Sequence, residues 1–442
     1  MEKKQSIGFG FRGWMLIVYQ AIAFLTFVFF TNWPMNALYD MYGGQTTVST
    51  IYTVAMIIGI VIQLIWSRSI GKVKNVKGIG IALGIVSLVL ALGIMLIPPS
   101  ALIVWQICYF LECLVVTLWC TFLIGILMGQ WFPRRKGTVM GIATFAFPIG
   151  NALLAAFTNS VFGSGVPQVF IAFLPYFIVC VIGLLIGAIF TKDYPEQVGC
   201  FRDNDRSITP EVAQAMMEQE IKAKETTVWT IGQTFKSRDF WFITLPMGLL
   251  LFSAVGMMTQ TVSIIGSYGF GPTSTEFNMI MLGVAVVACI GSWLLGVIDT
   301  KVGTKKAMLI SVIIMTVGGI FGAIQGSFPC LIVALACLAI FMGASSNFTV
   351  SGAAQYWRRE DFASVFARVN PIANILQAVG PMVLAILIAT KGPSSAFLLV
   401  GVMGAVSIVL VALFNPKHLK ETDDKYRQAA GKPLDDELVG RK

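Results

Sequence analysis

Charged residues are scarce in this chain: Asp, Glu, Lys and Arg make up 12% of its 442 residues, whereas hydrophobic residues make up 56%. A soluble globular protein carries about twice that share of charge, so water cannot be the solvent over most of this surface. Histidine is almost absent, since His418 is the only one in the sequence. Its isolation excludes histidine-based proton relays, histidine metal sites and Ser-His catalytic triads.

Nucleotide-binding glycine loops are also missing, and the eight cysteines have neither metal-site spacing nor the spacing of a disulfide framework. The net charge of +9 lies in short segments between apolar runs, which is typical of membrane topology and not of a nucleic-acid surface. We therefore expect no cofactor and no nucleic-acid partner. The lack of a nucleotide-binding loop also excludes a process that this chain would drive by nucleotide hydrolysis.

Long apolar runs are what the chain has in abundance. A helix needs about 20 apolar residues to cross the hydrocarbon core of a lipid bilayer. Runs of that length predict twelve transmembrane helices, near residues 13–38, 46–66, 78–97, 101–129, 138–160, 168–191, 240–265, 277–298, 306–326, 329–353, 366–390 and 394–414. The expected fold is an all-α, multi-pass membrane protein.

The basic residues predict an orientation. If both termini lie in the cytoplasm, 30 of the 31 Lys and Arg residues fall in cytoplasmic segments, and Lys391 is the exception. This layout obeys the positive-inside rule and predicts a protein of a bacterial plasma membrane with both ends in the cytoplasm. It divides the chain into a six-helix bundle over 1–191, a cytoplasmic linker over 192–239, a second bundle over 240–415 and a cytoplasmic polar tail over 416–442.

Three smaller expectations concern local structure. Thr209-Pro210-Glu211 is typical of a helix start, so a surface helix is expected from there to about Lys224. The tail after Pro416 is polar and is expected to be poorly ordered. Trp33, near the outer end of the first span, is expected in an interfacial aromatic belt.

The two bundles carry matching landmarks on their cytoplasmic side. Residues 130–136 (Gln-Trp-Phe-Pro-Arg-Arg-Lys) follow the fourth span, and residues 355–361 (Gln-Tyr-Trp-Arg-Arg-Glu-Asp) follow the tenth. Gly13-Trp14 opens the first span as Phe240-Trp241 opens the seventh, and the basic loop at 71–77 matches another at 299–306. These pairs lie 225 to 228 residues apart, which indicates a duplicated six-helix unit.

Two six-helix halves joined by a long cytoplasmic linker resemble the major facilitator superfamily over essentially the whole chain. Loop 296–306 (Gly-Val-Ile-Asp-Thr-Lys-Val-Gly-Thr-Lys-Lys) is similar to that superfamily's signature of a glycine, an acidic residue, a basic residue, a glycine and a basic pair. Residues 131–137, 239–241 and 359–363 are similar to the oxalate:formate antiporter and monocarboxylate transporter branch.

The resemblance implies a major facilitator fold of two pseudo-symmetric bundles and a secondary transporter, not an enzyme, that works as a functional monomer by alternating access. It also implies a path between the halves, lined mainly by spans one, four, seven and ten, with a small-molecule site near mid-membrane. Asp299, Arg134, Arg135 and Arg358 are then expected to help close the inner gate, with Asp299 pairing with a nearby base.

Glu112 is the one carboxylate deep within a predicted span, where a charge costs about 3 kcal/mol or more and should face a cavity or a partner. Burial favours the uncharged form of a carboxyl group, which suits a proton carrier. We expect Glu112 to bind a proton or the substrate; the alternative is a structural hydrogen bond to a neighbouring helix. Trp119 lies seven residues later on nearly the same face, where it is expected to floor a substrate pocket or to stack on a cation; the alternative is a packing or lipid-facing tryptophan.

Neutral amides lie on other helices near the expected path. They are Asn36 in the first span, Gln260 in the seventh, Asn347 in the tenth, and Asn374 and Gln377 on one face of the eleventh. Amides inside a membrane seek hydrogen-bond partners, so each is a candidate for a substrate contact or for a bond between helices.

Basic residues are missing from the interior of every predicted span. Related anion carriers hold a carboxylate with a basic residue on the eighth or eleventh helix, so the resemblance predicts a small organic anion while the residues make a zwitterionic, cationic or neutral metabolite competitive. Proton coupling and exchange are both open. A transporter-like membrane sensor is the alternative from another class, and the lack of a large soluble domain disfavours it.

Overall fold

The computed structural model describes residues 8–66, 73, 75–133, 135–205, 207, 209–223, 228–432 and 434. This part of the chain is almost entirely helical, and no strand occurs in it. Among the described residues, eleven helices are long and apolar enough to cross a membrane, or twelve when the bent pair α15 and α16 counts as one span. The predicted all-α fold with twelve spans is confirmed.

The first bundle contains six spans, several of them built from more than one helical piece. They are α1 (Phe11–Phe27) with η1 (Val28–Asn32) and η2 (Pro34–Leu38); α2 (Gln45–Trp66); α3 (Val76–Leu96); α4 (Leu102–Val116) with η6 (Thr117–Leu123) and α5 (Ile124–Trp131); α6 (Lys136–Ala143) with α7 (Ala146–Val161); and α8 (Val166–Phe190). The π-helices η1, η2 and η6 interrupt spans one and four, which is a feature that often marks functional sites.

The second bundle repeats the pattern after a linker. Its spans are α11 (Arg238–Met258) with α12 (Thr261–Gly266); α13 (Thr275–Val302); α14 (Thr304–Ala323); α15 (Phe328–Ser345) with α16 (Asn347–Tyr356); α17 (Arg359–Lys391); and α18 (Pro393–Leu413). The shorter helices α9 (Pro210–Ala223) and α10 (Ile231–Lys236) belong to the linker, and α19 (Pro416–Ala429) follows the last span. The helix predicted from Thr209 to about Lys224 is present as α9.

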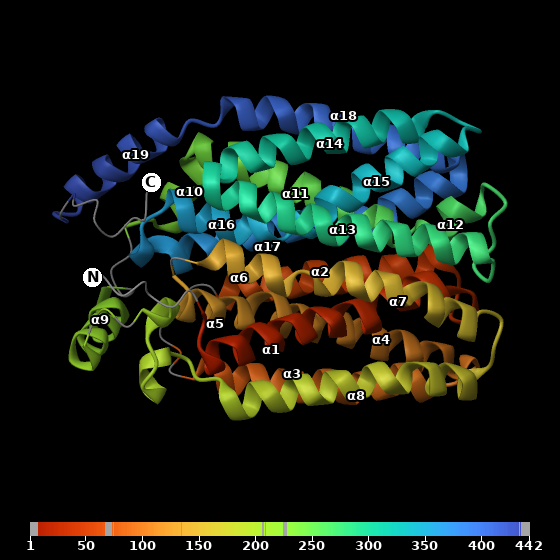
Figure 1. The fold of residues 1–442 in the computed structure, drawn as a ribbon, viewed down its shortest axis with the longest axis horizontal. Helices are drawn as coiled ribbons and strands as arrows, with labels where there is room; N and C mark the ends of the chain where they lie inside the picture. The colour runs from red at the N-terminus through yellow and green to blue at the C-terminus, as the bar shows by residue number, and fades with distance from the viewer. Residues whose placement is uncertain are drawn as a thin grey trace.

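The two bundles lie against each other along their length (Figure 1). Helix α2 packs on α17 on one side of the interface, and α7 packs on α13 on the other. Helices α9, α10 and α19 all lie at the end of the molecule where α1 begins and α18 ends, on the left in Figure 1, and we call this the terminal end. The opposite end, which carries α12, is the far end.

Glycines let helices approach closely inside each bundle, because small residues allow backbone-to-backbone contact where lipid supplies no hydrophobic driving force. Helices α14 and α18 cross at Gly319 and Gly401, where a Cβ on Gly319 would lie 2.3 Å from the Cα of Gly401. Helices α11 and α17 cross at Gly380, where a Cβ would lie 2.6 Å from the Phe252 carbonyl oxygen. Larger residues at these crossings would separate the helices.

The internal repeat is visible in matching contacts. Lys77, at the start of α3, donates from Nζ to the carbonyl of Ala188 near the end of α8, at 2.6 Å. Lys305, at the start of α14, donates to the carbonyl of Phe414 just after α18, also at 2.6 Å. In both bundles a lysine therefore caps the last carbonyls of the sixth span, where a cation is favoured by the helix dipole.

Two local expectations were wrong. The tail forms a helix, α19, from Pro416 to Ala429. Asn415 caps the start of this helix by accepting from the Lys417 backbone N–H, and Pro416 occupies the first helical position. Trp33 does not lie in an interfacial belt, because its side chain is fully buried and stacks on Phe157 with ring centroids 4.4 Å apart. Both errors come from tertiary contacts that a local pattern does not record.

Candidate functional site

A cavity of about 70 Å³ lies between the two bundles. It has room for several waters or for a small solute. Spans one, four, seven and ten all contribute to its wall, as expected from the resemblance, and spans five and eleven join them. The wall is largely apolar, and its polar residues are Gln20, Asn32, Thr121, Asn151, Ser345, Ser346, Thr349, Asn370, Asn374 and Gln377.

Four polar atoms of this wall are buried without a hydrogen-bond partner in the described part of the chain. They are Oε1 of Gln20, Oγ of Ser346 and Nδ2 of both Asn370 and Asn374. Leaving such a group unpaired costs about 1–3 kcal/mol, so a solute or water that pairs with them is favoured. None of the described residues that line the cavity is charged. The site therefore offers one amide acceptor, two amide donors and a hydroxyl, with no fixed charge.

The π-helix η6 forms most of the cavity wall that span four contributes. Two of its consecutive residues, Trp119 and Cys120, are bonded to two consecutive residues of span one. The indole Nε1 of Trp119 donates to the hydroxyl of Tyr19 at 2.7 Å inside the first bundle. One residue further along each helix, Nε2 of Gln20 donates to the carbonyl of Cys120 at 3.2 Å, and both residues face the cavity. These paired contacts fix the orientation of Gln20, which leaves Oε1 available.

Hydrogen bonds between the bundles close the far end. Gln45, the first residue of α2, donates from Nε2 to Oε1 of Gln260 at 2.6 Å and accepts at Oε1 from the hydroxyl of Ser263 at 3.0 Å. We call these two bonds the far-end latch. Two further bonds cross the interface, from Asn159 to Asn278 at 2.8 Å and from Thr53 to the Ala378 carbonyl at 2.7 Å.

Asp299 lies at the terminal end, where α13 meets the start of α6 in the other bundle. Its Oδ1 accepts from the Thr304 hydroxyl at 2.6 Å, and its Oδ2 accepts from the Ser351 hydroxyl at 2.5 Å. A Cβ placed on Gly137, in the first turn of α6, would lie 3.5 Å from Oδ2. The carboxylate therefore faces a helix N-terminus across the bundle interface, which favours a negative charge there.

Of the residues predicted to bind substrate, Asn374 and Gln377 line the cavity. Glu112 does not: it is fully buried between α3 and α4, where Oε1 accepts from the Ser87 hydroxyl at 2.7 Å and Oε2 has no partner in the described residues. Trp119 packs inside the first bundle with its indole bonded to Tyr19. Glu112 and Trp119 therefore do not share a site with the amides of span eleven, which line the cavity.

The other predicted amides also lie outside the cavity wall. Asn36 donates to the Asn32 carbonyl at 3.1 Å within span one, and Gln260 belongs to the far-end latch. Asn347 is buried at the start of α16, next to the cavity residue Ser346, and a Cβ on Gly141 of the first bundle would lie 3.8 Å from its Nδ2.

The predicted gating residues are dispersed. Arg135 lies with its guanidinium carbon 5.8 Å from the Phe9 ring centre, and its backbone N–H donates to Asp203 at 3.1 Å. Arg358 is buried and bonded to Asp423 of α19, away from the first bundle. Arg134 lies outside the described residues. Asp299 is the predicted gating residue whose contacts reach the bundle interface, and its described hydrogen-bond donors are hydroxyls.

The sequence reasoning missed Gln20 and Asn151. Gln20 is a single amide inside the first apolar run, and Asn151 is the same in the fifth. The rule that singled out Asn374, that an amide inside a span needs a partner, applies equally to both. The missing information was which face of each helix meets the other bundle.

Comparison with known proteins gives the family. The Major Facilitator Superfamily profile matches residues 15–274 and 265–438. The chain belongs to this superfamily. Its members are transporters and not enzymes, so the chain is a multi-pass membrane protein of the secondary-transport class that carries small molecules.

Two solved structures are similar to this chain. One is the human organic anion transporter MFSD10 (TETRAN), with a TM-score of 0.62 and 11% identity over 90% of this chain and 97% of that one. The other is the proton:xylose symporter XylE bound to 6-bromo-6-deoxy-D-glucose, with a TM-score of 0.63 and 15% identity over 93% of this chain and 98% of that one. At such identities the likeness shows the fold alone. No curated protein matches the sequence.

Proposed function

We propose that this protein moves a small organic solute across the plasma membrane by alternating access, with the solute held in the cavity between the bundles. The observation that carries this proposal is an uncharged cavity with four unpaired buried polar atoms in its wall, at the interface of two halves whose far end is closed by hydrogen bonds between them. Rocking of the halves would break the far-end latch and expose the cavity on that side. In this proposal the terminal end, where α1 begins and α18 ends, faces the cytoplasm.

The cavity wall supports a solute without net charge. A lone ion placed among neutral groups loses its hydration at a cost of several kcal/mol, and no described lining residue supplies a counter-charge. We therefore expect the solute to cross without net charge, as a neutral metabolite, a zwitterion or a small carboxylic acid that carries its own proton. A zwitterion would use both amide donors, Asn370 and Asn374, and the Gln20 acceptor.

A small organic anion remains a candidate, as the branch resemblance suggests. The fold accommodates both kinds of solute, since one similar structure is described as an organic anion transporter and the other as a proton:xylose symporter. The two donors Asn370 and Asn374 suit a carboxylate, because amide N–H groups can share its charge. Because none of the described lining residues is basic, an organic anion is the second choice.

Proton coupling has a candidate group in Glu112, outside the cavity. Its Oε2 is buried without a partner in the described residues, so a proton there would remove an unpaired charge. Span four connects it to the wall, because Cys120 and Thr121 of η6 line the cavity. Under this proposal Glu112 acts through the position of span four and does not touch the solute.

A ligand panel tests the site. Purified protein is screened by thermal shift against small carboxylates, their primary amides, betaines and sugars, and the strongest ligand is titrated against two variants. Asn374→Leu should weaken binding at least tenfold, because it removes an unpaired donor of the cavity at similar volume. Asn36→Leu, a matched amide outside the cavity, should bind as the parent does. Unchanged binding in Asn374→Leu together with lost binding in Asn36→Leu would place the site elsewhere.

A further inference from the structure

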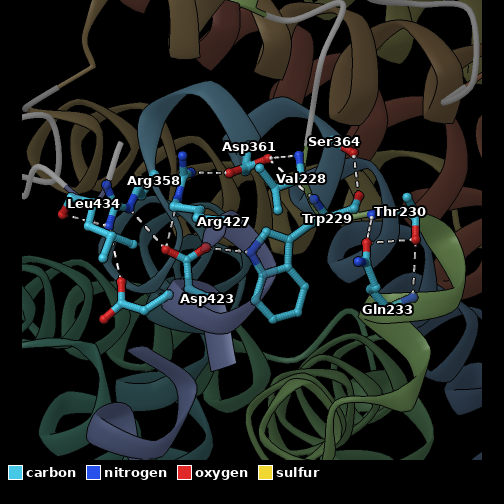
Figure 2. Close-up of polar contacts among 11 residues, drawn as sticks. Val228, Trp229, Thr230, Gln233, Arg358, Asp361, Ser364, Asp423, Arg427 and Leu434 are labelled. Atoms are coloured by element: carbon cyan, nitrogen blue, oxygen red, sulfur yellow. Dashed lines mark hydrogen bonds and ion pairs between the residues drawn. The ribbon is translucent and has the colours of Figure 1, made fainter. Parts of the chain in front are cut away.

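An ion network joins three segments at the terminal end of the second bundle (Figure 2). Arg358, at the junction of α16 and α17, donates from Nε to Asp423 of α19 at 2.9 Å. Arg427 of α19 donates to the same carboxylate at 3.1 Å and to Asp361 of α17 at 2.5 Å. All four side chains are at most 5% exposed. The tail helix is therefore held by buried charges, unlike a surface helix held by solvated ion pairs.

The end of the linker enters the same network, as Figure 2 shows. The backbone N–H groups of Val228 and Trp229 donate to Oδ1 of Asp361 at 2.9 and 3.4 Å. The indole of Trp229 donates to Asp423 at 2.8 Å. Arg368 donates to the Trp229 carbonyl at 2.7 Å. Since this linker segment leads through α10 into α11, the network ties the start of the seventh span to the junction of the tenth and eleventh.

Among the described residues, three arginines of the network face three aspartates. Arg358, Arg427 and Arg368 face Asp361, Asp423 and the half-buried Asp424, which accepts from Arg358 at 3.2 Å. Breaking one partner of a buried ion pair is far more costly than losing a surface pair, because the remaining charge stays buried without compensation. Each member therefore depends on the others, and the three segments should separate together or not at all.

The first bundle carries a counterpart at the repeated positions. The junction after span four has Arg135, whose backbone N–H donates to Asp203 in the segment after span six. That segment is held further by Trp131, whose indole donates to the Lys192 carbonyl at 2.8 Å. The segment before span one contributes Phe9 beneath Arg135 and the Gly8 carbonyl, which accepts from Asn204 at 3.1 Å.

Each half therefore has the same three-part arrangement. A segment before its first span and a segment after its sixth both contact the junction that follows its fourth span. We call each arrangement a terminal cap. The start of the linker is the after-segment of the first cap, and α19 is the after-segment of the second. Because a terminal cap occurs in both copies of the repeat, we assign it to the duplicated unit and not to the tail alone.

We propose that α19 is the closing piece of the second terminal cap, and that the cap makes spans seven, ten and eleven move as one body when the halves rock. The movement in this statement rests on the proposed function, whereas the coupling through the cap does not. Opening the cap by removing one α19 charge should loosen the Val228–Trp229 segment and the start of α17, which are bonded to α19 through the network. Tyr426 of α19 also packs on the Trp229 ring, with ring centroids 5.2 Å apart, and this contact stays in the variant.

Hydrogen exchange of the purified full-length protein tests the coupling. In Arg427→Ala, the amides of Val228 and Trp229 should exchange roughly ten- to a hundredfold faster, because their acceptor Asp361 loses its counter-charge. Segment 192–205 of the first cap should keep its rate. Lys425→Ala removes an equal charge from an exposed position of the same helix and should change neither segment. If Arg427→Ala does not fold, Asp424→Ala replaces it, because Asp424 is partly exposed and its loss costs less. In Asp424→Ala the exchange rates of the same segments should rise by a smaller factor.

Two results would overturn the proposal. Faster exchange confined to α19 would mean that the helix only covers the bundle, and a uniform rise in both halves would mean that it supports the whole fold. Transport separates the two proposals: slower transport with unchanged ligand binding in Asp424→Ala supports movement through the cap. If the Asn374 test fails while exchange rises only in the second cap, the cap stands and the proposed solute site does not.

Discussion

Replacing Gln45 with alanine should open the far end of the protein. The change removes both bonds of the far-end latch, which join Gln45 to Gln260 at 2.6 Å and to Ser263 at 3.0 Å across the bundle interface. Each neutral hydrogen bond contributes about 0.5–1.5 kcal/mol, so the closed state should lose about 1–3 kcal/mol relative to the open state. That difference raises the ratio of open to closed molecules about 5- to 150-fold.

A cysteine in the cavity reports this opening. Thr121 lines the cavity, so Thr121→Cys, in a variant whose native cysteines (the cavity-lining Cys120 among them) are replaced by alanine, should react with a maleimide at a rate that follows the open population. Combined with Gln45→Ala, the labelling rate should rise by the factor given above. Gln106→Ala is the matched control, because Gln106 lies near the same end but bonds to the Tyr42 carbonyl within its own bundle. Equal labelling rates in both double variants would refute the latch.

Three further predictions follow from the same contacts. Glu112→Gln should remove the pH dependence of uptake into proteoliposomes between about pH 5 and 8, and a retained pH profile would leave Glu112 with a structural role. Asp299→Lys should impair transport, since it places a cation against the start of α6 and loses two hydroxyl donors, whereas normal transport would exclude Asp299 from the inner gate. Gly319→Ala should lower the unfolding temperature, with an expected cost of about 1–3 kcal/mol from overpacking against Gly401, while Gly283→Ala, where the added Cβ meets open space, should not.

The twelve spans and the repeat were predictable because hydropathy and basic loops are local properties of the sequence. Lys77 and Lys305, matched in the sequence, make the same contact in the structure. Tail helix α19 was missed because its order depends on Asp361, a residue far away in the chain, although Asn415-Pro416 is a visible helix start.

The candidate site was harder to predict for a geometric reason. A helix position tells which residues share a face, but it does not tell which neighbouring helix that face meets. Glu112 meets α3 and Trp119 meets span one, both inside the first bundle, whereas Asn374 lines the cavity between the bundles. The π-helix η6 also shifts the register of span four, so an ideal helical wheel misplaces the residues that follow Val116.

The division of the linker between the two caps has a consequence for how the protein can be assembled. Its first part is bonded to one half through Asp193 and Asp203, its last part is bonded to the other through Trp229, and α9 lies between them. A chain cut within α9 would leave each fragment with a complete cap. The two fragments, made as separate polypeptides, should therefore fold independently and pair in the membrane, so that one gene could be divided into two at this helix without loss of the carrier.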